Sequence, residues 1–237
     1  MARRNTLAIF LYYYINKLYL HINNLITILK MVLPSNIKAV LFDMDGVIFD
    51  TEDLYTDFWK RELFCYLPDD PDIFDKVKGS TLNDILTRYF KEDEIREKVV
   101  AAIDHFETTM PFIYIRGYES YFKSIKEKGY KCAVVTSSND KKMANVFKTY
   151  PTFKNQYDTI ITADDITLSK PNPQCFLLAA ERLGVKPEEC AVFEDSIHGL
   201  NAARAAGMYV VGVATSNPYD VVKAMSDVII NDFEDTL

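Results

Sequence analysis

Three features are missing from this sequence of 237 residues, and each absence disfavours a class of protein. The four cysteines form no CxxC pair and have no histidine at zinc-ligand spacing, which disfavours a zinc site. Positive charge is not in excess, because 34 acidic residues outweigh 27 basic ones and give a net charge of -7. That sign disfavours general binding to nucleic acid or to an anionic membrane. We therefore expect a globular cytoplasmic protein with reduced thiols, in which any anionic ligand needs a local positive site.

The third missing feature is an uninterrupted apolar run of membrane-spanning length. Residues 1–30 are apolar and rich in tyrosine, but a lysine, a histidine and two asparagines interrupt a span that would need about 20 apolar residues. Paired arginines precede an apolar run as in a signal peptide, yet no small-residue cleavage site follows. Apolar residues at heptad spacing leave a self-associating helix as a third interpretation. We treat residues 1–30 as an appended segment, expect Met31 to be the true start, and leave membrane contact by the segment open.

From residue 37 onward, short β-branched runs alternate with amphipathic segments. This alternation is typical of a parallel sheet wrapped by helices, so we predict an α/β fold with a Rossmann-like core. In residues 172–184, for example, apolar side chains share one face of a helix that Gly184 would end. No internal repeat or low-complexity segment appears after residue 30. The predicted strands are residues 38–43, 131–137, 158–162, 190–194, 208–214 and 227–230.

One stretch breaks the alternation, because residues 52 to about 112 contain no convincing strand and read as successive helices. Ser80 or Thr81 can cap one of these helices. We predict an all-helical cap domain at residues 51–112, inserted into a core domain that consists of residues 31–50 and 113–237. Both junctions lie beside the acidic cluster or carry proline and glycine, as expected for the hinges of a closing lid.

Acidic side chains gather directly after the first predicted strand, where KAVLFDMDGVIFDTED places five carboxylates within eleven positions. Neighbouring negative charges cost free energy unless a cation, a proton or a ligand compensates them. In open parallel sheets, ligands bind at the carboxyl ends of the strands, and the fourth strand also ends in two acids. Together these oxygen ligands suit Mg²⁺. The predicted metal site comprises Asp43, Asp45, Glu194 and Asp195.

The same strand ends offer the groups that phosphoryl transfer needs. Asp43 can attack a phosphorus atom, and Asp45 can protonate the leaving oxygen and then activate water. Lys170 supplies fixed positive charge. Alone, Thr136 would be only a helix cap and Lys170 only a solvated loop lysine. The predicted substrate-binding residues are Thr136, Ser137 and Asn139 at a helix start, together with Tyr55 in the insert.

Four sequence blocks follow one another at the ends of predicted strands: DMDGVIFDTE, VVTSSN, SKPNPQCF and FEDSIHGLNAARAAGM. In this order they resemble the haloacid dehalogenase superfamily, in particular the beta-phosphoglucomutase-like phosphatases with a small helical cap. The resemblance runs from about residue 37 to the C-terminus, and it implies a phosphoric monoester hydrolase. It further implies Asp43 as nucleophile, Asp45 as acid/base with its backbone carbonyl on the metal, and Asp195 as direct Mg²⁺ ligand. Glu194 would support the metal through water or a contact to its ligands.

Departures from the family pattern separate the candidate functions. Tyr55 stands where the mutases have a cap histidine, and the arginine that follows their Lys-Gly pair is missing after Gly79. We therefore expect hydrolysis of a small sugar or polyol phosphate by a monomer, with a sugar-phosphate mutase as the alternative. A phospho-accepting signalling domain would also combine a strand-end aspartate, a threonine and a lysine, but it lacks the helical insert. A catalytically silent anchor is disfavoured because no expected catalytic position is missing.

Overall fold

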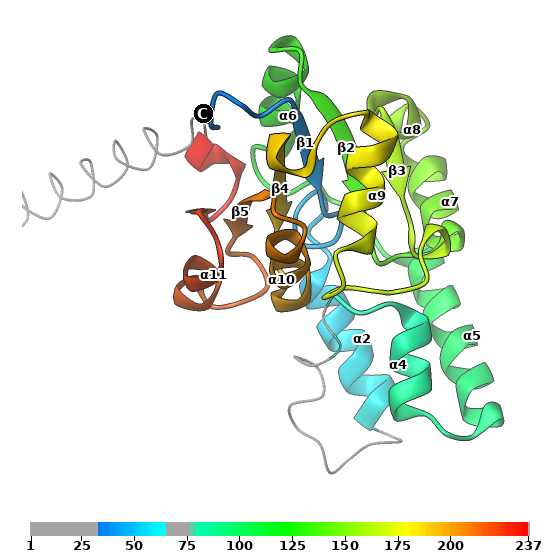
Figure 1. The fold of residues 1–237 in the computed structure, drawn as a ribbon. Helices are drawn as coiled ribbons and strands as arrows, with labels where there is room; N and C mark the ends of the chain where they lie inside the picture. Colours follow the sequence, from blue (N-terminus) through cyan, green and yellow to red (C-terminus); the bar gives the residue numbers. More distant parts are fainter. Residues whose placement is uncertain (1–32, 65–76, 78, 237) are drawn as a thin grey trace, which may run out of the picture.

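The computed structural model describes residues 33–64, 77 and 79–236, so the segment 1–30 lies outside the described residues. Six parallel strands form one sheet in the order β3-β2-β1-β4-β5-β6 (Figure 1), which confirms the predicted α/β class. Each lies within a predicted segment. The strands are β1 (Ala39–Phe42), β2 (Lys131–Val135), β3 (Thr159–Ile161), β4 (Cys190–Glu194), β5 (Tyr209–Val213) and β6 (Val228–Ile230).

Helices cover both faces of the sheet, which is why most residues of the strands are apolar. Successive side chains of a strand point to opposite faces. Val40 and Phe42 of β1 accordingly join one apolar cluster with α6 (Tyr118–Glu127) and α7 (Asp140–Thr149). Ala39 and Leu41 join a second cluster on the other face. That face is covered by α9 (Gln174–Leu183), α10 (Ile197–Ala205) and α11 (Tyr219–Met225), and α8 (Phe153–Gln156) follows α7.

Between β1 and α6 the described chain forms only helices, in agreement with the expected all-helical insert. They are α2 (Glu52–Phe64), α4 (Leu82–Tyr89) and α5 (Asp93–Thr109), below the sheet in Figure 1. They enclose an apolar cluster of their own around Trp59, Ile85 and Ile103. Thr81 caps α4 by accepting a hydrogen bond from the amide of Asp84. The exact boundaries of a separate cap domain stay a prediction.

Two connecting segments join the insert to the core side by side. The amide of Asp50 donates to the carbonyl of Ile113 at 2.8 Å, and the amide of Ile115 donates to the carbonyl of Ile48 at 2.9 Å. This pairing holds α2 and α5 over the carboxyl ends of the strands (Figure 1). Within the described residues, no helix is both long enough and apolar enough to cross a bilayer.

Candidate active site

The site lies where the strand order reverses. The chain runs outward through β2 and β3 on one side of β1 and through β4 to β6 on the other, so the loops after β1 and β4 diverge. Such a switch point leaves a crevice in which ligands of open α/β sheets bind. The amide of Asp43 donates to the carbonyl of Phe193 at 3.0 Å, which ties the two strand ends together. A cavity of about 360 Å³ opens here between the strand ends and the helical insert.

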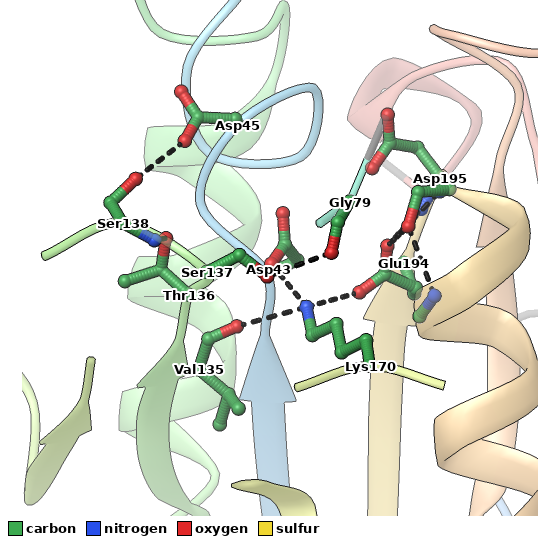
Figure 2. Close-up of polar contacts among 12 residues, drawn as sticks. Asp43, Asp45, Gly79, Val135, Thr136, Ser137, Ser138, Lys170, Glu194 and Asp195 are labelled. Atoms are coloured by element: carbon green, nitrogen blue, oxygen red, sulfur yellow. Dashed lines mark hydrogen bonds and ion pairs between the residues drawn. The ribbon is translucent and has the colours of Figure 1, made fainter. Parts of the chain in front are cut away.

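Three buried carboxylates meet at this point, with one oxygen of each within 4.8 Å of the others (Figure 2). They belong to Asp43, Glu194 and Asp195. The ammonium of Lys170 lies 2.6 Å from Oδ1 of Asp43 and 2.8 Å from Oε2 of Glu194. It also donates to the carbonyl of Val135 at 3.3 Å. Lys170 thus pairs with two of the three carboxylates, and the ionised cluster of three acids and one lysine carries a net charge of -2.

The electrostatics of this acidic cluster reflect that imbalance. Burial raises the pKa of Asp43 well above its ordinary value, and the charge of Glu194 adds to the effect. Burial likewise raises the pKa of Asp195, and the negative charges of Glu52 and Glu194 raise it further. Burial lowers the pKa of Lys170, but the two carboxylates it contacts outweigh that effect and raise it. Hard oxygen donors with surplus negative charge fit a divalent cation.

The carboxylate of Glu194 is held by the start of α10. Ser196 donates its hydroxyl to Oε1 of Glu194 at 2.7 Å and its amide to the same atom at 3.0 Å. Gly199 leaves the room for it, since a Cβ at that position would collide with the Glu194 carboxylate. The geometry of the cluster therefore depends on a serine and a glycine that themselves carry no charge.

The carboxylate of Asp195 is held by the loop after β5. Ser216 donates its hydroxyl to this carboxylate, and Asn217 donates to the backbone carbonyl of Asp195 at 3.0 Å. Gly46, which has a φ of 75°, passes so close that a side chain there would collide with Asp195. Sequence reasoning missed Ser216 and Asn217, although the strand-end rule applied to the fifth strand would have indicated them.

The carboxylate of Asp45 lies outside the acidic cluster, so a contact of Asp45 with the metal through its backbone carbonyl stays a prediction. Figure 2 shows the carboxylate turned away from Asp43 and toward Ser138. Thr51 donates to Oδ1 of Asp45 at 2.6 Å, and Ser138 donates to Oδ2 at 3.1 Å. Lys142 contacts both oxygens at 2.6 Å. The predicted set of four carboxylates is thus divided, because Asp45 has a lysine of its own.

Lys142 is a residue that sequence reasoning missed. Its side chain is only 1% exposed, and it lies on the face of α7 that also buries Met143 and Val146. A lysine on the apolar face of a helix indicates an acidic partner, because burying an unpaired charge costs free energy. That position, six residues after Thr136, was the available signal.

The predicted substrate-binding residues all line the cavity. Thr136 is buried and accepts a hydrogen bond from the amide of Ser138 at 3.0 Å. Ser137 donates to the carbonyl of Gly79 in the insert at 2.9 Å. Asn139 caps α7, where its side-chain oxygen accepts from the amide of Lys142 at 2.9 Å. Its other role, in substrate binding, stays a prediction.

Tyr55 reaches the cavity from α2. It donates its hydroxyl to Glu107 of α5 at 2.7 Å, and the ammonium of Lys142 lies 4.5 Å from the centre of its ring. Burial raises the pKa of Tyr55, and the negative charges of Asp45 and Glu107 raise it further. The tyrosine therefore connects two helices of the insert with the lysine that holds Asp45.

Comparisons with known proteins agree with this geometry. A family model described as haloacid dehalogenase-like hydrolase matches residues 40–213. A putative phosphatase, YhcW of Bacillus subtilis, is 34% identical over 187 residues, which cover 73% of this chain and 81% of that one. A phosphorylated carbohydrates phosphatase of Thermotoga maritima is 30% identical and covers 80% and 88%. A beta-phosphoglucomutase of Mycobacterium bovis is 29% identical and covers 76% and 81%.

Proposed function

We propose that this chain, which belongs to the haloacid dehalogenase-like hydrolase family, is a Mg²⁺-dependent phosphatase that hydrolyses a small sugar or polyol phosphate. The predicted enzyme class, a phosphoric monoester hydrolase, is confirmed by the relatives named as phosphatases. The observation that carries the finer proposal is the acidic cluster. Asp43, Glu194 and Asp195 lie close together beside a cavity large enough for a small metabolite, and Lys170 pairs with the first two.

Asp43 and Asp45, which follow β1, have different roles in the proposed reaction. Lys170 contacts Oδ1 of Asp43, so the second oxygen of Asp43 attacks the phosphorus. The bond from phosphorus to the leaving oxygen breaks, and Asp45 gives that oxygen a proton. Water then attacks the phosphorus of the phospho-aspartate, Asp45 takes a proton from the water, and the bond to Asp43 breaks. Free phosphate leaves, and both aspartates return to their starting forms.

The metal would be held by the carboxylates of Asp43 and Asp195, with Glu194 supporting them. When bound, Mg²⁺ supplies positive charge that offsets the repulsion between an anionic nucleophile and an anionic phosphoryl group. Lys170 adds a fixed charge at Asp43. Thr136 and the amides that follow it, at the start of α7, hold the phosphoryl oxygens in this proposal.

The cavity favours a substrate with a single phosphate. Among the described residues that line it, Lys142 is the only lysine or arginine, and it is already paired with Asp45. Glu107 and Asp84, which also line it, are suited to accept hydrogen bonds from hydroxyl groups. A mutase would have to retain a sugar bisphosphate, whose second phosphate needs a cation of its own. Hydrolysis is therefore favoured over the mutase alternative, although one relative is named as a mutase.

The test measures free phosphate released by the full chain from a panel of sugar and polyol phosphates, with Mg²⁺ or with a chelator. We expect Mg²⁺-dependent release from a few related compounds and a loss of roughly 10⁶-fold in Asp43→Asn, the order seen when a nucleophile is removed. Full release by Asp43→Asn would contradict the phospho-aspartate. Isomerised phosphosugar without free phosphate would instead support the mutase.

A further inference from the structure

We propose that Lys142 is a positioning residue, which fixes the carboxylate of Asp45 and connects it to the helical insert. This inference rests on the proposed function, in which Asp45 gives and takes the proton. Neither the four sequence blocks nor the acidic cluster includes Lys142, and its assignment comes from its contacts alone.

The first observation is the number of contacts that Lys142 makes to one carboxylate. Its ammonium lies 2.6 Å from both Oδ1 and Oδ2 of Asp45, and the side chain is only 1% exposed. Thr51 and Ser138 donate to the same two oxygens. The hydroxyls and the ammonium together leave the carboxylate little freedom to rotate. A buried charge-assisted contact of this kind is among the stronger hydrogen bonds in proteins.

The second observation is what packs on the other side of Lys142. The ring of Tyr55, from α2, lies 4.5 Å from its ammonium, a favourable distance for a cation over an aromatic face. The hydroxyl of Tyr55 donates to Glu107 of α5. Burial raises the pKa of Glu107, whereas the charge of Lys142 lowers it, so these two groups interact electrically. Lys142 therefore lies between the acid/base residue and two helices of the insert.

The third observation is that α7 makes further contacts with the insert. Lys141 pairs with Asp104 of α5, and Asn145 donates to the carbonyl of Glu107 at 3.4 Å. The loop that precedes α7 donates from Ser137 to Gly79. A shift of the insert would thus be felt first at α7, and through Lys142 at Asp45.

The consequence for catalysis is specific. Proton transfer needs the carboxylate of Asp45 within hydrogen-bond distance of the leaving oxygen, and positioned general acids contribute about 10²–10⁴-fold in rate. If Lys142 sets that position, its removal slows substrates whose leaving oxygen must be protonated. It spares substrates whose leaving group departs unprotonated. A purely structural role would slow both kinds alike.

The experiment compares kcat/KM for two substrates, because this ratio reports the step that forms the phospho-aspartate. One is the most active alkyl phosphate of the panel, and the other is p-nitrophenyl phosphate, whose phenolate leaves without a proton. We expect Lys142→Met to lower kcat/KM about 30-fold or more for the alkyl phosphate and less than about 3-fold for the aryl phosphate. Lys142→Arg, which keeps the charge, should recover part of the loss. Equal losses for both substrates, or none for either, would overturn the proposal.

A matched control is available next door on the same helix. Lys141→Met removes an equally charged side chain and breaks a pair with the insert, but it does not touch Asp45. It should leave the ratio between the two substrates unchanged. Asp43→Asn should lose activity toward both substrates. Retained activity in Asp43→Asn would contradict the proposed function, whereas equal losses for both substrates in Lys142→Met would contradict only this inference.

A second measurement does not need activity. In a double-mutant cycle, Lys142→Met should lower the thermal midpoint of the full chain, and its effect should shrink by at least half in the Asp45→Asn background. Strict additivity of the two midpoint shifts would show that Lys142 does not act through Asp45, whatever the enzyme hydrolyses.

Discussion

The carboxyl edge of the sheet carries two acidic groups that differ in how their charge is compensated. At β1 and β4, Asp43, Glu194 and Asp195 lie together, and Lys170 pairs with the first two, which leaves the cluster with a surplus of two negative charges. Across the cavity, Asp45 has Lys142 to itself and two hydroxyl donors besides. The carboxylates of both groups are buried or nearly so, and both groups lie at the carboxyl edge of the sheet.

In the proposed function, this difference separates metal binding from proton transfer. A cluster with surplus charge is destabilising by itself and gains from a cation, so it is suited to hold a metal in place. A carboxylate whose charge is already balanced gains little from a metal and remains available for proton transfer. The predictions below alter one group at a time.

The largest effect should follow from removing the shared lysine. Lys170→Met leaves three buried carboxylates without a cation, and breaking a buried pair in this way costs about 3–5 kcal/mol. The matched change Lys142→Met leaves one carboxylate, 18% exposed at its side chain and still bound by hydroxyls, so its cost should be about half as large. Urea unfolding in the presence of chelator measures both.

Mg²⁺ sharpens the same contrast. Relative to the wild type with Mg²⁺, the ion should reduce the stability deficit of Lys170→Met, since it takes over compensation of the cluster, and should leave the deficit of Lys142→Met unchanged. Equal recovery of the two variants, or a larger cost for Lys142→Met in chelator, would show that the two groups are not separate.

The next effect concerns one ligand of the acidic cluster. In chelator, Asp195→Asn should raise the free energy of unfolding by about 1 kcal/mol, because an uncompensated charge disappears. The pKa of Asp195 is raised by burial and by neighbouring acids. Its stabilising contribution is therefore present below the ordinary aspartate pKa of about 4 and is lost as the pH rises through the raised value. The difference in the free energy of unfolding between Asp195→Asn and the wild type should therefore grow as the pH rises over that range.

With Mg²⁺ present, the order should reverse, since the wild type gains stability from binding the ion and Asp195→Asn has lost a ligand. Thermal melts at several Mg²⁺ concentrations measure this. If the variant melts lower than the wild type in chelator, the surplus charge of the cluster is compensated in some other way.

How far the sequence predicts this molecule depends on the physical signal. The strands follow from apolar runs that must be buried on both faces, so their six positions could be predicted, as could Thr81 as a helix cap. The meeting of Asp43, Glu194 and Asp195 follows from the rule that parallel strands end at one edge.

Other features could not be predicted because they depend on side-chain direction. Nothing in the spacing DMDG shows that the carboxylate of Asp45 turns away from Asp43, since that depends on a partner 97 residues along the chain. The contact between Tyr55 and Glu107 joins two helices whose packing the sequence leaves open. Residues that hold charged groups, such as Ser216, carry no charge that would mark them.

A smaller effect should follow from filling the space beside Glu194. Gly199→Ala would place a methyl group against that carboxylate, although alanine favours helices by about 1 kcal/mol over glycine. We expect Glu194 to move and phosphate release to fall about 10–100-fold, as for other residues that orient metal ligands. Asn201→Ala, at an exposed position of the same helix, is the control and should retain activity. Unchanged activity and Mg²⁺ response in Gly199→Ala would mean that the position of Glu194 matters less than the position of Asp45.

The smallest effect separates two roles of Asn139, which lines the cavity at the start of α7. As a helix cap, its replacement by alanine should cost about 1 kcal/mol in stability, whereas serine, which also caps, should cost little. If capping is its only role, Asn139→Ser retains the wild-type KM, because the amides of the loop stay in place. If the side chain also contacts substrate, KM rises in the serine variant while its stability does not change. Thermal melts and phosphate-release kinetics on the same pair of variants distinguish these outcomes, and a fall in stability for both would remove the capping role itself.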